Sequence, residues 1–429
     1  MEIATLYTYF KECGRVTTDT RNCPEGSMFI ALKGETFNGN AFAKQSLEKG
    51  CRYAVVDEAQ YADDPNIFLV DDCLKTLQML AREHRRRMGT PIVGITGTNG
   101  KTTTKELIAT VLQKRYNVLY TQGNLNNHIG VPLTLLGLTE EHEMAVVEMG
   151  ANHPGEIRTL VNIAEPDCGL ITNVGKAHLE GFGSFEGVVK TKSELYDYLR
   201  SKEDAFIFLD KDNRVLCDAS AGLKNIGYGL ESDDLYIKGK LHACAPFLAF
   251  EWEHEGKTYD VNTYLIGAYN VKNALAAIAI GSHFEVPAEA ICEALNGYIP
   301  SNNRSQLTET KDNHLIVDAY NANPTSMMAA LENFRFMEVA HKVAILGDMK
   351  ELGEGSVDEH RKIISFLEGC GFERIILVGD EFGKANSGFE WYKNTDDLKA
   401  KISEEKISGK FVLIKGSNSM KLAPLKDIL

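Results

Sequence analysis

The fold is decided by the stretch Thr96-Gly97-Thr98-Asn99-Gly100-Lys101-Thr102-Thr103. It follows an apolar run at 91–95 and precedes a segment whose apolar residues recur at helical spacing. A strand, a glycine-containing turn and a helix in this order favour an anion, because backbone N–H groups and the helix N-terminus surround it. Lys101 can reach the outer phosphates, and the Thr102 hydroxyl suits Mg²⁺. The stretch therefore predicts a nucleotide-binding α/β domain, and we expect ATP.

The loop is a variant of the strict P-loop pattern. That pattern would place glycine at position 95, where this chain has Ile95. Its position between a predicted strand and a predicted helix still supports phosphate binding. Motors, switches and ligases all use such loops, so the reaction must be inferred from the polar residues around this one.

Two further buried strands are predicted at 144–147 and 168–172, because each is a short continuous apolar run. Glu148 ends the first, and His178 follows the second. If both strands flank the phosphate-loop strand, their carboxyl ends open at one edge, where Glu148 and His178 can hold metal beside the phosphates. The alternatives are that Glu148 caps a turn and that His178 is an ordinary loop histidine.

The chain is expected to fold into three domains, since 429 residues exceed one ordinary core. Residues 1–88 contain short strand-like runs at 28–32, 53–56 and 67–70, followed by a helical stretch, and predict a small α/β domain.

The other two blocks are larger. Residues 89–300 predict a central P-loop-type domain with a mostly parallel sheet, and 274–280 within it reads as a buried helix. Residues 301–429 contain four apolar runs, each followed by Asp, Gly or Lys-Gly. That series predicts a doubly wound, Rossmann-like domain whose ligand crevice lies beyond the carboxyl ends of its strands.

Composition excludes several classes of protein. The net charge of −14, from 46 Lys plus Arg and 60 Asp plus Glu, repels polyanions, so we expect no nucleic-acid partner. The dense basic run at 85–87 is interpreted as a solvated helix end. Nine scattered cysteines without CxxC spacing suit a reducing cytosol. With no signal peptide and no run near the roughly 20 apolar residues that span a bilayer, we expect a cytoplasmic monomer without membrane insertion.

Several segments, in order along nearly the whole chain, resemble the motifs of the Mur ligase family. These enzymes form amide bonds with ATP in peptidoglycan precursor synthesis. The matching segments are 96–102, 123–127, 130–132, 148–153, 177–183, 190–194, 267–270 with Asn273, Arg304, and 318–326.

Within the family, four segments are most similar to the branch that adds D-alanyl-D-alanine. They are 18–21, 29–34, 318–327 and 346–353. The Asp-Asn-Pro-Arg stretch of the branch that adds the third residue does not occur in the sequence. The resemblance therefore implies UDP-N-acetylmuramoyl-tripeptide and D-alanyl-D-alanine as substrates, in the last cytoplasmic amide-forming step.

The resemblance also implies a mechanism. A peptide carboxylate attacks the ATP γ-phosphate to give an acyl phosphate, and the amine of the dipeptide then displaces phosphate. Hydrolysis of the acyl phosphate competes, so domains that close and exclude water are expected.

Roles for individual residues follow from the same resemblance. The implied ATP-binding residues are Gly97, Thr98, Asn99, Gly100, Lys101, Thr102, Thr103, Asn270, Asn273, Arg304 at the γ-phosphate and Asp318 at the ribose. The implied magnesium ligands are Thr102 and Glu148, with His178 for a second ion. Tyr269 stands where many relatives have His, so the residue at that position departs from the family pattern.

Lys192 matches the lysine that the family carbamylates with CO₂, which turns a cation into an anion able to ligate metal. With Lys101, Glu148 and His178 it completes the expected catalytic set. The alternative is a solvated lysine on a helix face, and Lys190 is a near neighbour in register.

Two substrate sites are predicted outside the nucleotide. Arg and Lys pair with a diphosphate and hydroxyls with a sugar. The candidates for the UDP end are Thr18, Asp19, Thr20, Arg21, Lys33 and Gly34. Those for the dipeptide are Tyr320, Asn321, Asn323, Thr325 and Ser326. The alternatives are a capped surface turn for the first set and N-capping of the following helix for the second.

Two other functions stay open. A sibling ligase could add a different amino acid or glutamate, as folylpolyglutamate synthases do. A P-loop regulator or motor would hydrolyse ATP without an amine acceptor and would need no equivalent of Lys192 or Asp318. The C-terminal block, which brings its own crevice, favours a ligase.

Overall fold

The N-terminal part of the chain forms a small parallel sheet. In the computed structural model, which describes residues 1–244, 246–300, 306–385 and 388–429, its strands pair in the order β1-β2-β3-β4. All three predicted strands form, as β2, β3 and β4, and α1 is an addition to the predicted elements. The bounds are α1 (Ile3–Cys13), β1 (Val16–Thr17), β2 (Met28–Ile30), α2 (Ala43–Glu48), β3 (Tyr53–Val56), β4 (Ile67–Leu69) and α3 (Cys73–Met88).

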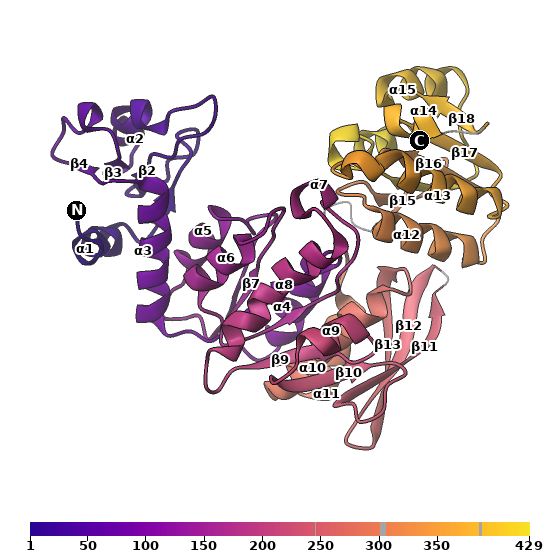
Figure 1. Ribbon diagram of the computed structural model, residues 1–429, viewed down its shortest axis with the longest axis horizontal. Helices are drawn as coiled ribbons and strands as arrows, with labels where there is room; N and C mark the ends of the chain where they lie inside the picture. Colours follow the sequence, from indigo (N-terminus) through magenta and orange to yellow (C-terminus); the bar gives the residue numbers. More distant parts are fainter. Residues whose placement is uncertain (245, 301–305, 386–387) are drawn as a thin grey trace.

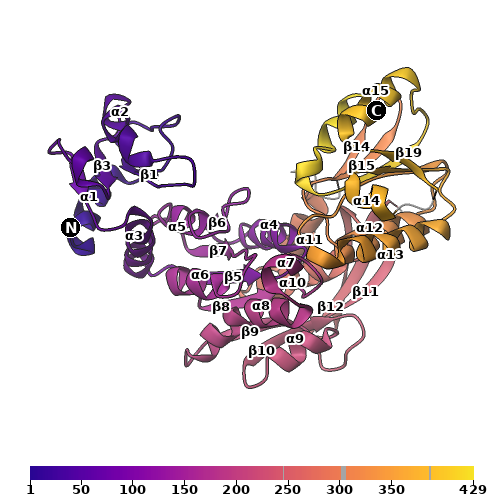
Figure 2. The ribbon, with the colours of Figure 1, turned by 45° about the horizontal axis from the view of Figure 1, so that its top comes forward.

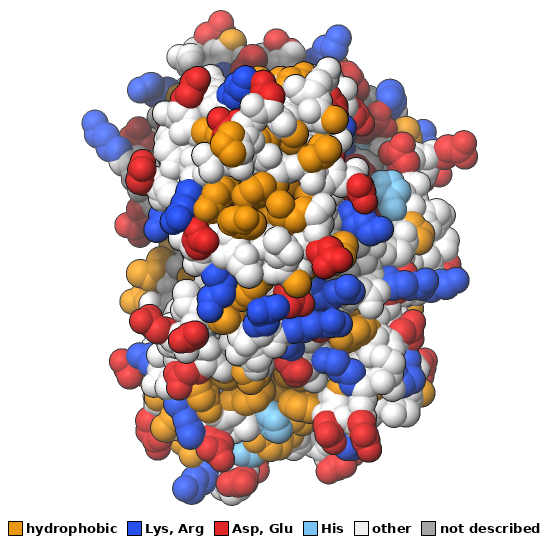
Figure 3. Space-filling view, turned by 90° about the vertical axis from the view of Figure 1, so that its left-hand side faces the viewer, with side chains coloured by type: hydrophobic (Ala, Val, Ile, Leu, Met, Phe, Trp, Pro, Cys, Tyr) orange, Lys and Arg blue, Asp and Glu red, His pale blue; other side chains and the backbone are white. Residues whose placement is uncertain are grey.

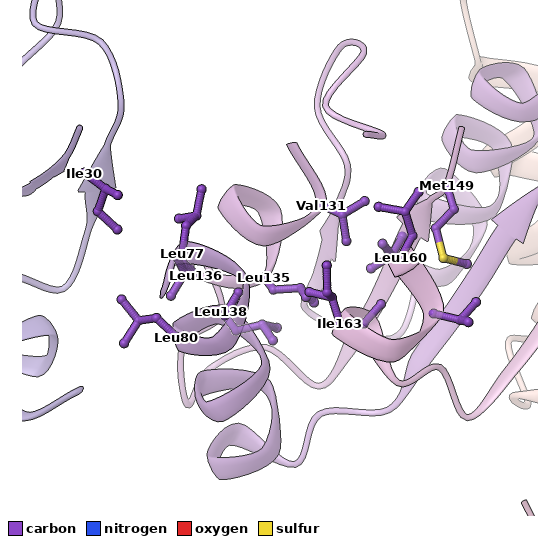
Figure 4. Packing of buried hydrophobic residues seen from close by; sticks show 14 of the residues in the cluster. Ile30, Leu77, Leu80, Val131, Leu135, Leu136, Leu138, Met149, Leu160 and Ile163 are labelled. Carbon is purple, nitrogen blue, oxygen red and sulfur yellow. The ribbon is translucent and has the colours of Figure 1, made fainter. Parts of the chain in front are cut away.

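Helix α3 joins the N-terminal sheet to the rest of the protein. Asp72 caps its start by accepting the N–H of Lys75 at 2.8 Å, and Gly89 ends it with φ 67°. One buried cluster runs from the N-terminal sheet across α3 to helices α5 and α6 (Figure 4). Its labelled members are Ile30, Leu77, Leu80, Val131, Leu135, Leu136, Leu138, Met149, Leu160 and Ile163. The N-terminal sheet therefore shares apolar packing with the central one through this helix.

The prediction of a solvated basic run is wrong for Arg85. Its guanidinium is buried and donates to the carbonyl of Ala164 at 3.0 Å and to Asp167 at 2.9 Å. The other two arginines of the run make ion pairs at the surface. Burial of Arg85 is tolerated because its donors meet acceptors at the end of α6.

The central sheet positions the phosphate loop. Its order is β13-β12-β11-β10-β9-β8-β5-β7-β6, and β5 lies between β7 and β8 with all three parallel. Ile95 is opposite Glu148 on one side and Leu170 on the other. Both predicted strands therefore flank the phosphate-loop strand, and the carboxyl ends of β5, β7 and β8 open at the same edge of the sheet.

The central domain consists of the strands of this sheet and the helices that pack against it. The strands are β5 (Ile92–Thr96), β6 (Val118–Tyr120), β7 (Met144–Glu148), β8 (Cys168–Ile171), β9 (Phe206–Asp210), β10 (Lys224–Gly229), β11 (Ile237–Cys244), β12 (Phe247–His254) and β13 (Lys257–Ile266). The helices are α4 (Lys101–Leu112), α5 (Gly130–Leu135), α6 (Glu156–Ala164), α7 (Leu179–Phe182), α8 (Phe185–Arg200), α9 (Arg214–Ala219), α10 (Asn270–His283) and α11 (Ala288–Gly297). The predicted buried helix forms as α10.

The C-terminal sheet has the order β14-β15-β19-β16-β17-β18, with only the β14–β15 pair antiparallel among its described strands. The four predicted apolar runs form β15, β16, β17 and β19, and β14 and β18 add the edges. The bounds are β14 (Gln306–Glu309), β15 (His314–Asp318), α12 (Pro324–Phe336), β16 (Lys342–Gly347), α13 (Ser356–Glu368), β17 (Arg374–Val378), α14 (Asp380–Ala385), β18 (Glu390–Tyr392), α15 (Thr395–Glu404) and β19 (Phe411–Lys415). The predicted α/β fold class is confirmed, whereas the domain boundaries at 88/89 and 300/301 stay predictions.

The N-terminal and C-terminal sheets lie at opposite ends of the central domain (Figures 1 and 2). Seen from the N-terminal end, acidic and basic side chains are interspersed around a patch of hydrophobic ones (Figure 3). None of the helices in the described ranges combines the length and apolarity needed to cross a bilayer.

Candidate active site between the central and C-terminal domains

The phosphate loop adopts a conformation that requires glycine at two positions. Gly97 has φ 143°, and a Cβ there would lie 2.1 Å from Thr172 Oγ1. Gly100 has φ 77°, and a Cβ would lie 2.8 Å from Asn273 Oδ1. The loop is therefore packed tightly against the ends of β8 and α10. Lys101 Nζ folds over it and donates to the carbonyls of Gly97 and Thr98 at 2.8 and 2.9 Å.

Two side chains whose oxygen atoms can ligate a metal ion lie beside this loop. The Thr102 hydroxyl donates to Glu148 Oε2 at 2.9 Å, and Asn126 Nδ2 donates to Glu148 Oε1 at 2.7 Å. Glu148 is only 1% exposed, and Thr121 accepts its backbone N–H. A hydroxyl and a carboxylate are ligands that Mg²⁺ prefers, so this corner fits the ion. Asn126 lies in a segment that the sequence singles out, but no role was predicted for it.

His178 contacts the C-terminal domain. It directly precedes α7 with φ 50°, and its buried Nδ1 lies close to Glu351 Oε2 without forming a hydrogen bond. Burial lowers the pKa of the imidazole, the carboxylate of Glu351 opposes this shift, and the ammonium of Lys101 lowers the pKa further. A neutral imidazole is the form that can ligate a metal.

Lys192 is buried in α8, so the alternative of a solvated lysine is wrong. Its side chain is 2% exposed, and Nζ donates to the carbonyl of Ala151 at 3.1 Å. Burial holds the pKa of this ammonium well below its usual range, with repulsion from Lys101 in the same direction. Lys190, two residues earlier, is exposed. Only Lys192 of the two has the environment that favours a neutral, nucleophilic amine.

A cleft of about 830 Å³ connects these groups to the C-terminal domain. Many of the site residues predicted from the sequence line this cleft. They are Thr98, Asn99, Gly100, Lys101, Thr103, Glu148, His178, Asn270, Asn273, Asp318, Tyr320, Asn321, Thr325 and Ser326. Leu74 and Gln78 of α3 lie at its border. The structure thus brings most of the expected ATP and dipeptide residues around one space, although Gly97, Thr102, Asn323 and Lys192 do not line it. Arg304 lies outside the described residues.

The asparagines of α10 hold each other in place. Asn273 Nδ2 donates to Asn270 Oδ1 at 2.8 Å, and Asn270 Nδ2 donates to the carbonyl of Ile266 at 2.7 Å. Thr104 of α4 donates to Asn273 Oδ1 at 3.1 Å. These bonds fix both asparagine amides against the phosphate-loop helix.

Asp318 has a partner that the sequence analysis did not assign. Lys415 Nζ lies 2.5 Å from Asp318 Oδ2, and the two residues are directly paired across β15 and β19. Lys415 is buried and borders the cleft. Its only signal in the sequence is the Lys-Gly that follows an apolar run.

The dipeptide segment combines capping with a domain contact. Asn323 caps α12 by accepting the N–H of Ser326 at 2.9 Å, and Ser326 Oγ accepts the N–H of Asn323, so N-capping describes this pair. Asn323 Nδ2 also donates to Asn99 Oδ1 in the phosphate loop at 2.7 Å. Thr325 Oγ1 accepts the N–H of Lys176 at 3.2 Å. These two contacts tie the C-terminal domain to the central one.

The residues expected at the UDP end do not line this cleft. Asp19 accepts the N–H of Arg21 at 2.9 Å and pairs with its guanidinium at 2.7 Å, so a capped surface turn describes the segment locally. Lys33 pairs with Asp57 and Glu58 at 2.8 and 3.0 Å. Both cations therefore have carboxylate partners within the N-terminal part of the chain.

Comparison with known proteins identifies the class. The Mur ligase middle domain matches residues 95–281, and the Mur ligase glutamate ligase domain matches 303–418. The chain belongs to the Mur ligase family, as its motifs predict.

Two relatives indicate which branch of the Mur ligase family this chain resembles. The chain is 36% identical to the UDP-N-acetylmuramoyl-tripeptide–D-alanyl-D-alanine ligase of Bacillus subtilis, over 96% of this chain and 93% of that protein. It is 34% identical to the Escherichia coli ligase of that name, over 94% and 91%.

Two solved structures of MurF resemble this chain over nearly its full length. A crystal structure of MurF from Acinetobacter baumannii matches with a TM-score of 0.88 at 28% identity, covering 99% of this chain and 97% of that one. MurF of Thermotoga maritima in complex with ADP matches with 0.86 at 27% identity, covering 96% of both chains.

Proposed function

We propose that this protein is an ATP-dependent, ADP-forming ligase that joins D-alanyl-D-alanine to UDP-N-acetylmuramoyl-tripeptide through an acyl phosphate. The names and the full-length coverage of its relatives support this function. The observation that carries it is the cleft itself, with Lys101 and Glu148 on one wall and Asp318 and Lys415 on the other. A motor or switch needs the first wall but not the second. The reaction belongs to the last cytoplasmic amide-forming step of peptidoglycan precursor synthesis.

The chemistry begins with the meeting of two anions. Repulsion between a carboxylate and a phosphate at a few ångströms costs roughly several kcal/mol in a partly buried site. Lys101 offsets that repulsion and stabilises the charge that develops in the transition state. Mg²⁺, when bound, neutralises phosphate charge in the same way. Thr102 and Glu148 would hold one ion and His178 a second.

The proposed reaction needs no reactant other than ATP, the tripeptide carboxylate and the dipeptide amine. A carboxylate oxygen attacks the γ-phosphorus, and the bond from that phosphorus to ADP breaks. The dipeptide amine then attacks the acyl carbon and loses a proton, and phosphate leaves with the oxygen that came from the carboxylate. Water would divert the acyl phosphate, so the contacts of Asn323 and Thr325 across the domains support a closed state that protects it.

Lys192 is proposed to act as a carbamate formed with CO₂. The amine nitrogen bonds to the carbon of CO₂ and loses a proton, giving an anion. The lowered pKa of the buried lysine supports this reaction, because only the neutral amine can attack.

The remaining roles are part of the same proposal. Arg304 would contact the γ-phosphate and Asp318 the ribose. Thr18, Asp19, Thr20 and Arg21, with Lys33 and Gly34, would contact the UDP end. Tyr320, Asn321, Asn323, Thr325 and Ser326 would face the dipeptide. We also propose a monomer of three domains (1–88, 89–300 and 301–429), and the nine free thiols suit the cytoplasm.

A substrate screen tests the function. Phosphate release from ATP is expected only when UDP-N-acetylmuramoyl-tripeptide and D-alanyl-D-alanine are both present, because the acyl phosphate needs both a carboxylate and an amine to turn over. The measurement is released phosphate, with mass spectrometry of the product. Release with a single amino acid would favour a sibling ligase, and release without any acceptor would favour a regulator or motor.

A further inference from the structure

Lys415 and Asp318 form a buried ion pair in the wall of the cleft. Lys415 Nζ donates to Asp318 Oδ2 at 2.5 Å, and the lysine is only 1% exposed. Both residues line the cleft. Taking an ammonium out of water is costly, and apolar residues of similar volume often give a fold equal stability. The pair is therefore better explained by the site that it borders than by the stability of the domain.

The two strands beside β19 fix the backbone of Lys415. The lysine lies opposite Asp318 of β15 on one side and Leu346 of β16 on the other. A Cβ on the next residue, Gly416, would lie 3.0 Å from the Cα of Gly347, so β16 and β19 approach closely at this point. Lys415 therefore reaches Asp318 from the carboxyl ends of parallel strands, where α/β sheets bind their ligands.

The segment that follows Lys415 is fastened to the end of β16. The backbone N–H of Ser417 donates to the carbonyl of Asp348 at 3.1 Å. The Oγ of Ser417 accepts the backbone N–H of Lys350 at 3.0 Å. The C-terminal domain thus holds the chain on the far side of Lys415 as well.

Asp318 has one carboxylate oxygen left for a ligand. Its side chain is 17% exposed, and its Oδ1 accepts no hydrogen bond from the residues that the structure describes. Asp318 also shares a small hollow with Tyr269, which directly precedes Asn270 at the start of α10. A carboxylate oxygen on this side of the cleft can accept ribose hydroxyl groups, as an acidic residue does in dinucleotide-binding α/β folds.

The bond to Lys415 limits how Asp318 can present that oxygen. An aspartate side chain without a partner rotates about two bonds and can turn either oxygen toward a ligand. A charge-assisted hydrogen bond at Oδ2 restricts this rotation. A group that is ordered before its ligand arrives loses less entropy on binding, so the ion pair favours the affinity of the site.

We propose that Lys415 is a positioning residue of the nucleotide site: by binding Oδ2 of Asp318 it orients the carboxylate so that Oδ1 accepts the ribose hydroxyl groups, and it thereby gives the site its preference for a ribonucleotide. This inference rests on the proposed function for the identity of the ligand, but nucleotide binding can be measured without ligation.

The test compares the binding of ADP with that of its dideoxy analogue, which lacks both ribose hydroxyl groups. Calorimetric titrations with Mg²⁺ and no other substrate give the two dissociation constants. We expect the wild type to bind ADP about 10-fold more tightly than the analogue, because a hydrogen bond to a charged group is lost. In Lys415→Met the two constants should differ by less than about twofold, with that of the analogue nearly unchanged. Lys415→Arg should keep part of the preference, because a guanidinium still donates to the carboxylate.

Lys410→Met is the matched control. Lys410 directly precedes β19 and pairs with Glu373 at the other end of the strand, so its removal also breaks a lysine–carboxylate pair. The control should keep the wild-type ratio of the two constants. A wild-type ratio in Lys415→Met, or an equal loss of affinity for both nucleotides, would overturn the proposal. A wild type that binds both nucleotides equally would overturn it too.

A double variant keeps the proposal testable if Lys415→Met does not fold. Asp318→Asn removes the carboxylate that would otherwise be left without its partner. If Lys415 acts through Asp318, adding Lys415→Met to Asp318→Asn should change the affinity for ADP by less than about twofold. A further loss of about 10-fold would contradict the proposal. A wild type that prefers ADP but does not ligate would count against the proposed function and leave this inference standing.

Discussion

Lys192→Ala is expected to lose about 100-fold or more of its ligation rate. The side chain is buried, and its carbamate would supply an anion that alanine cannot replace. Added formate, acetate or propionate should restore part of the rate, because a small carboxylate can occupy the place of the carbamate. The measurement is the ligation rate with and without these acids.

Lys190→Ala is the matched control, since Lys190 lies on the same helix and is exposed. It should keep the wild-type rate and show no response to carboxylic acids. Normal activity of Lys192→Ala would remove Lys192 from the mechanism. Rescue of Lys190→Ala instead would show that the register of the motif is off by two residues.

Lys101→Ala is expected to lower kcat/KM for ATP by about 1,000-fold, which corresponds to about 4 kcal/mol of transition-state stabilisation. The ammonium of Lys101 folds over the phosphate loop at Gly97 and Thr98, and alanine removes this positive charge from the loop. Lys101→Arg should recover little, because a planar guanidinium does not fit a site shaped for a point charge. The measurement is steady-state ATP turnover with both substrates present.

Lys114→Ala is the control for the loss of a positive charge near the same helix. Lys114 follows α4 at its far end and pairs with the exposed Glu293 at 2.9 Å, so its removal should leave turnover unchanged. An equal loss in both variants would indicate a general effect of charge, and a Lys101→Ala enzyme that turns over ATP normally would contradict the assigned role.

Much of this site follows from local sequence rules. The phosphate loop and the polar strand ends at Glu148 and Asp318 are predicted, because parallel strands place their carboxyl ends at one edge of the sheet. The family resemblance added Lys192, whose burial no local pattern shows. The short edge strands β14 and β18 carry too few apolar residues to stand out.

Contacts between residues far apart in the sequence were the part that the sequence could not provide. Glu351 lies 173 positions from His178, and Lys415 lies 97 positions from Asp318, so no spacing rule links either pair. Arg85 likewise reads as a surface charge until α6 brings its acceptors alongside. Asn323 illustrates the same limit, because its capping role is visible in the sequence but its bond to Asn99 is not.

The central claim is that the terminal phosphoryl group of ATP is transferred to a carboxylate before the amide forms. The direct measurement uses UDP-N-acetylmuramoyl-tripeptide labelled with ¹⁸O in the carboxylate that receives D-alanyl-D-alanine. The account predicts that each released phosphate carries one labelled oxygen. Phosphate without the label, in a reaction that still forms the amide, would contradict it.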